Sequence, residues 1–211
     1  MRLKTTIELF DYWNRLRGAE IAPLRNEVEP TQLRNILSSL FMLEMVDSDR
    51  VVFRLAGTRI CDFFGRDLGG AAIDSLWAHG CDDIGKTAAG VMTHALPALL
   101  NATGYSAAGH RAAFEIILLP LRNAEGKCDK LLGAIAPATA ASWLEVVPLE
   151  FLVLDRSRLL HEELGKSSVA GEETVNGSAP TRPLTIAETV RQMMSHLFDA
   201  NSDVSVTPRH N

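Results

Sequence analysis

Three residues in the middle of the chain carry groups that could bind a metal or a haem. His79 and Cys81 form a His-x-Cys pair, and His94 lies in a helical pattern further along. A structural zinc site needs four ligands, and a third and fourth cannot be placed from the sequence. A single histidine can be the axial ligand of a haem only within a shaped pocket. We therefore assign no metal site, and a haem- or metal-dependent sensor or small enzyme that uses these residues stays as the alternative.

A second motif could bind phosphate. Gly104 and Gly109 have the glycine spacing of a phosphate-binding loop. However, His110 and Arg111 occupy the places of the required Lys and Ser/Thr, and the following residues alternate like a strand instead of opening a helix. The stretch therefore predicts a turn between strands. Because no Ser/His/Asp set has a recognisable spacing either, we expect a protein that is not an enzyme.

Composition narrows the classes of partner and compartment. The net charge is −5 and the pI is about 5.7, which argues against a nucleic-acid-binding surface. No stretch reaches the roughly 18 apolar residues of a membrane span, and the N-terminal region carries Glu8 and Asp11 where a signal peptide needs an apolar run. The three cysteines are widely spaced and odd in number. A cytoplasmic protein without disulfide bonds is the expectation.

The elements that would position any site begin with a helix and a hairpin. Residues 5–17 have the periodicity of an amphipathic helix that ends at Gly18. Residues 41–46 and 51–56 alternate in hydrophobicity around a polar turn, which predicts two paired strands. A short helix from Thr58 to Phe64 follows. A hairpin that leads into short helices is typical of small sensory α+β domains and favours regulation over catalysis.

The second half predicts a long helix and more strands. The helix runs from about Asp82 to Leu100, with Pro97 as a kink or an early end. Strands are predicted over 104–108, 111–121 and 130–138, and residues 149–154 form a last strand or a docking segment.

The strand predicted over 111–121 is apolar on both faces. An antiparallel sheet commonly has one face in water, so a second layer must cover this one. The helix at 5–17, from the same chain or from a second copy, is the candidate cover.

Several blocks of the sequence resemble the PAS superfamily, and within it the short stand-alone PAS proteins of bacteria. The most specific are Arg54–Thr58 and Phe64–Leu68. The other matching positions are Asp11–Trp13, Leu16–Gly18, Pro23, Arg25, Pro30, Phe41, Leu43, Glu44, Phe53, Cys61, Gly70, Leu76, Trp77, Phe114, Glu115, Leu119–Leu121, Leu132 and Gly133.

This resemblance implies an α+β PAS fold. Its five-stranded antiparallel sheet has helices on one face, and the N-terminal helix packs on the other face or across a dimer. The expected organisation is a helix and connector over 1–30, a PAS core over 31–155, a flexible linker over 156–183, and a short C-terminal helix and tail over 184–211.

The resemblance also implies a sensory function without catalysis, exercised in bacterial signalling through a small ligand or through protein contacts. PAS cofactors bind between the sheet and the long helix, but the cofactor here stays unknown. Cys61 is flanked by Ile60 and Asp62, unlike the Asn-Cys-Arg type of flavin motif, so no flavin site is inferred.

Two sets of candidate residues follow from the alternation. The candidates for a ligand pocket are Phe53, Leu55, Phe64, Met92, Leu96, Phe114 and Ile116. The candidates for a homodimer interface are Leu9, Phe10, Trp13, Leu16, Ile117 and Leu119. A homodimer is expected, with a small-molecule ligand or a signalling protein as further partners, and neither nucleic acid nor a membrane span.

Overall fold

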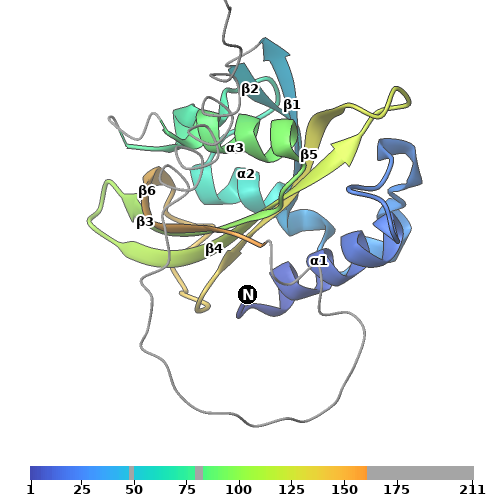
Figure 1. The fold of residues 1–211 in the computed structure, drawn as a ribbon. Coiled ribbons are helices and arrows are strands. Elements are labelled where there is room, and N and C mark those ends of the chain that lie inside the picture. Colours follow the sequence, from blue (N-terminus) through green and yellow to red (C-terminus); the bar gives the residue numbers. More distant parts are fainter. Residues whose placement is uncertain (48–49, 79–82, 161–211) are drawn as a thin grey trace, which may run out of the picture. The chain divides into compact units, whose positions relative to one another are not determined.

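The computed structural model describes residues 1–47, 50–78 and 83–160. Six antiparallel strands form one sheet in the order β2-β1-β5-β4-β3-β6 (Figure 1). The strands are β1 (Leu40–Asp47), β2 (Arg50–Ala56), β3 (Ala98–Ser106), β4 (Arg111–Arg122), β5 (Cys128–Pro137) and β6 (Leu149–Leu159). The segment 161–211, with most of the predicted linker and all of the predicted C-terminal helix, lies outside the described residues.

The sheet has one strand more than the five predicted. The extra strand, β6, pairs with β3 from Leu149 to Leu159, so it continues past residue 155, the predicted end of the core. Apolar residues at its buried positions, such as Leu149 and Leu152, explain why this segment joins the sheet. The glycine-rich stretch before His110 is the predicted turn: Gly109 has a φ of 81° and donates to the Ser106 carbonyl.

The long helix is shorter than predicted. Helix α3 spans Asp83–His94, and Ala95 then adopts a φ of 52°, in the left-handed region. Pro97 disfavours the helical conformation in the residue before it. Strand β3 starts at Ala98, so the helix end at Leu100 is wrong and the early end before Pro97 is confirmed. Leu96 lies on the link between the two elements.

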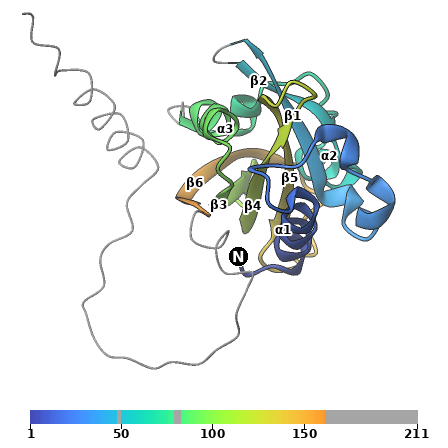
Figure 2. The same cartoon turned by 45° about the vertical axis from the view of Figure 1, so that its right-hand side comes forward.

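Helices cover both faces of the sheet. Helix α2 (Thr58–Phe64) ends at Gly65 as predicted, with a left-handed φ of 61°. It lies with α3 on one face, here called the inner face, whereas α1 (Lys4–Arg17) lies on the other, here called the outer face (Figures 1 and 2). Helix α1 contacts β4 and β5 of its own chain. The cover predicted for the doubly apolar strand thus comes from within one chain.

Short 3-10 helices connect α1 to the sheet. They span Arg25–Glu27, Pro30–Leu33 and Leu37–Ser39. The last of them packs against the end of β2, where Gly57 donates to the Leu40 carbonyl at 2.7 Å. This connector therefore forms a wall beside the outer face, next to the edge strand β2.

Candidate functional site

The inner face holds most of the residues predicted to line a pocket. Phe53, Phe64, Met92, Phe114 and Ile116 are all buried there. The Phe114 ring meets Phe63 of α2 edge to face at 5.4 Å, and Phe53 meets Phe41 at 5.7 Å. On the inner face, Phe53 and Phe114 are thus packed against aromatic rings of the same chain.

Leu55 lies on the outer face instead. A bulge in the β1–β2 pairing places Phe53 opposite Leu43 but Leu55 opposite Met42. Since Leu43 and Met42 point to opposite faces, the extra residue Arg54 moves Leu55 out of the predicted pocket. Leu55 is 59% exposed.

The other predicted ligands and pocket residues are also placed apart from this packed centre. Leu96 is half-buried on the link after α3, and His94 is exposed at the end of that helix. His79 and Cys81 lie outside the described residues. No group of three His, Cys, Asp or Glu side chains suited to a metal occurs among residues 1–47, 50–78 and 83–160.

The start of α1 is anchored by a carboxylate on β4. Glu115 is buried and accepts hydrogen bonds from the backbone N–H groups of Arg2 and Leu3, each at 3.1 Å, and from the Thr6 hydroxyl. Burial raises the pKa of Glu115, but these hydrogen bonds lower it by more, so the net pKa lies below its usual value. Glu115 therefore holds the first turn of α1 to the sheet as a carboxylate.

The six candidates for a dimer interface lie in this same contact. Trp13 is fully buried and donates from its indole nitrogen to the Pro120 carbonyl at 2.8 Å. Leu16 is half-buried. The remaining four, all buried in one chain, are Leu9, Phe10, Ile117 and Leu119.

A groove of about 270 Å³, here called the apolar groove, opens on the outer face between the connector and strands β1, β2 and β5. Its floor comes from the strands and includes the buried residues Leu40, Met42 and Leu132. Its rim includes Leu37 and Leu55, which are 47% and 59% exposed. The remaining lining residues are Arg25, Val28, Pro30, Leu33, Phe41, Ala56 and Gly57.

A second groove, also about 270 Å³ and here called the polar groove, lies next to it. It is lined by Leu24, Arg25, Asn26, Arg122, Asn123, Ala124, Asp129 and Lys130. Arg25 lines both grooves.

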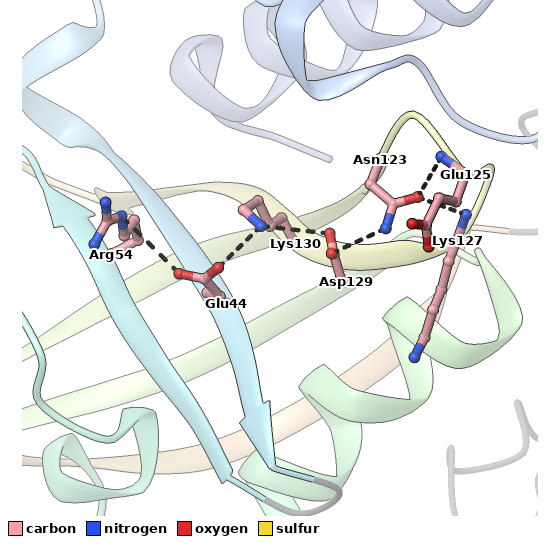
Figure 3. A network of polar contacts seen from close by, with 7 residues as sticks. All are labelled: Glu44, Arg54, Asn123, Glu125, Lys127, Asp129 and Lys130. Atoms are coloured by element: carbon pink, nitrogen blue, oxygen red, sulfur yellow. Dashed lines mark hydrogen bonds and ion pairs between the residues drawn. The ribbon is translucent and has the colours of Figure 1, made fainter.

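A row of polar contacts runs from β2 to the β4–β5 turn (Figure 3). Lys130 lies 2.9 Å from Glu44, which also faces Arg54 at 3.9 Å. Asn123 donates to Asp129 at 3.1 Å. Glu44 therefore balances the positive charge of Lys130, and the row of contacts holds the side chains at the floor of the polar groove in position.

The sequence did not point to these grooves. Their residues come from the connector, from strands β1, β2, β4 and β5, and from the β4–β5 turn. In addition, the alternation in β2 placed Leu55 on the wrong face. Arg54, the residue that forms the bulge, has no feature in the sequence that marks it as extra.

A family model described as a PAS domain matches residues 1–136. The chain belongs to the PAS domain family. The match includes α1, the connector and all of the strands except Pro137, the last residue of β5, and the whole of β6. The inner and outer faces described above are thus the two faces of a PAS sheet. PAS domains serve in sensing and regulation, which is the class of function that this membership indicates.

Solved structures similar to this PAS chain include light-oxygen-voltage domains. One studied with a flavin analogue is 14% identical with a TM-score of 0.42, covering 52% of this chain and 83% of that chain. The dark structure of the photoreceptor Aureochrome1 LOV is 12% identical with a TM-score of 0.41, covering 51% of this chain and 80% of that chain. The LOV protein of Rhodobacter sphaeroides is 15% identical with a TM-score of 0.39, covering 55% of this chain and 71% of that chain. At these values the likeness carries no information about a ligand.

No curated protein matches the chain. Among the helices of the described residues, none is long and apolar enough to cross a bilayer.

Proposed function

We propose that this PAS protein is a non-catalytic regulator of the bacterial cytoplasm, which acts in signalling through noncovalent contacts at the apolar groove. The observation that carries the proposal is the combination of a buried apolar floor with the exposed rim residues Leu37 and Leu55. Grouped apolar side chains that stay open to water are typical of interaction sites.

The outer groove is better suited to this function than the inner face. The inner candidates Phe53 and Phe114 are already in contact with aromatic rings of the same chain. A ligand there would have to displace packed side chains, whereas the apolar groove offers a surface that is already formed.

A homodimer remains part of the proposal. Because the interface candidates are mostly buried in one chain, two copies would have to exchange α1 or meet through its outward side. Ile7, which is 39% exposed, lies on that side. A haem- or metal-dependent function has less support, since the exposed His94 is not enclosed by other groups.

The test replaces the chromosomal gene with genes for the variants. Transcript levels in each variant strain are then compared with those in the wild type and in a strain that lacks the gene. We expect Leu55→Asp to reproduce the deletion, because a carboxylate on the rim makes the apolar groove unfavourable for a partner. The matched control is Val146→Asp, a change at a residue that is 76% exposed and lies outside both grooves.

Both variants are first checked for a wild-type circular dichroism spectrum and melting temperature. If a folded Leu55→Asp protein restored wild-type transcript levels, the groove would not carry the function. Equal loss of function in the two variants would likewise count against this site.

A further inference from the structure

The two grooves on the outer face meet at one arginine. Arg25 stands on the first 3-10 helix and lines the apolar groove on one side and the polar groove on the other. A ligand lying across this junction would contact hydrocarbon along most of its length and a cation at one end. An apolar surface that ends at a cation suits an amphiphile with an anionic head.

The apolar part is preformed. Its wall at Leu37–Ser39 is fixed to the end of β2, since a Cβ atom at Gly57 would lie only 2.7 Å from the Leu37 carbonyl oxygen. The Gly57 N–H donates to Leu40 at 2.7 Å and closes the same corner. An apolar chain could therefore enter without the cost of ordering the groove around it.

The charge of Arg25 is available to a ligand. Of the other two cations in the polar groove, Lys130 faces Glu44 at 2.9 Å, and Arg122 faces Glu20 at 3.1 Å and donates to the Ala22 carbonyl. The Arg25 guanidinium has no hydrogen bond or ion pair with any residue in the described ranges. An anionic head would meet it as the first strong partner.

The polar groove also limits how much negative charge the head can carry. Asp129 lines it, and its Oδ1 atom is buried without a hydrogen-bond partner, although Lys130 lies 3.6 Å away. A head with two negative charges would be repelled more strongly by the Asp129 carboxylate than a head with one. A head with one charge fits the groove better than a phosphate.

We propose that the apolar groove binds an aliphatic monocarboxylate of medium length, with its hydrocarbon chain against Met42, Leu55 and Leu132 and its carboxylate on Arg25. This proposal assigns a class of ligand to the groove of the proposed function. A regulatory role for that ligand rests on the proposed function. A groove of about 270 Å³ is small for a ligand site, which favours a single chain over a diacyl lipid.

The test is a titration of the full-length, ¹⁵N-labelled protein with decanoate, below its micelle concentration, followed by NMR. We expect shifts of the backbone amides of Leu37, Leu55, Ala56 and Leu132. In the series hexanoate, octanoate and decanoate, affinity should rise by about two- to fourfold for each added methylene as apolar surface is buried.

Charge recognition is tested separately with decanol, which has the same chain and no charge. Arg25→Gln should weaken decanoate at least tenfold and leave decanol unchanged. The matched control Arg34→Gln removes an exposed arginine of the same connector outside both grooves, and it should change neither affinity.

Three results would overturn the proposal: no saturable decanoate binding, equal binding of decanol and decanoate by the wild type, or shifts confined to inner-face residues such as Phe53 and Phe114. None of them would decide the proposed function, which rests on the complementation experiment. If decanoate failed to bind while Leu55→Asp still abolished function in cells, the groove would belong to a protein partner.

Discussion

Among single side chains, Glu115 does the most to define the outer face. It is the one buried carboxylate among the residues that the structure describes, and it accepts hydrogen bonds from three donors at the start of α1. Its neighbours on β4, Phe114 and Ile116, point to the inner face. A single strand position thus links the helix on one face with the core on the other.

Replacing Glu115 with Gln should destabilise the fold by about 1–3 kcal/mol, because the amide carries no negative charge for the three donors and sets its own N–H group against the Arg2 N–H. Urea unfolding measures the change. The control Glu150→Gln alters an exposed residue of β6 and should stay within about 0.5 kcal/mol of wild type. Equal stability of the two variants would contradict the anchoring role of Glu115.

The same carboxylate predicts a dependence of stability on pH. Because the folded pKa of Glu115 is lowered, its contribution is fully present above the ordinary pKa of about 4.3. It is lost as the pH falls through the lower folded pKa. The melting temperatures of wild type and Glu115→Gln should therefore converge below about pH 4 and differ by a constant amount near neutrality. A gap that widens on acidification would show that the sign is wrong.

Among the elements, α1 and the strands show what a sequence pattern can and cannot predict. The end of α1 at Gly18, the end of α2 at Gly65 and the two-sided strand β4 all follow from local signals. The bulge at Arg54 does not, because an extra residue shifts the register without changing the composition of the strand. That one shift moved Leu55 from the predicted pocket to the groove.

Two glycines predict opposite effects of a change to alanine. At Gly133 on β5, a Cβ atom would press on the Phe41 ring and lie 2.7 Å from the Ile117 carbonyl oxygen, so Gly133→Ala should destabilise by about 1–3 kcal/mol. At Gly90 in α3, nothing lies within 4 Å of the new atom. Gly90→Ala should therefore stabilise by about 0.5–1 kcal/mol through helix propensity. Thermal melts that shift in the same direction for both variants would contradict the packing of β5.

For the molecule as a whole, the PAS fold could be predicted from the sequence, and the site could not. Blocks such as Arg54–Thr58 and the alternation of β4 are local in sequence, and the family match over residues 1–136 confirms what they imply. The grooves depend on how the connector after α1 folds back beside β1 and β2. That arrangement is set by tertiary contacts such as the one between Gly57 and Leu40, which no local pattern records.

Native mass spectrometry of the protein purified from its own cells tests the central claim, regulation through noncovalent contacts at the outer face, most directly. The account predicts species heavier than the 23.0 kDa chain, either a homodimer or a complex with a partner or ligand. Leu55→Asp should lose the added partner or ligand while Val146→Asp keeps it. A spectrum that contains nothing but the bare 23.0 kDa monomer, for the wild type and both variants alike, would contradict the account.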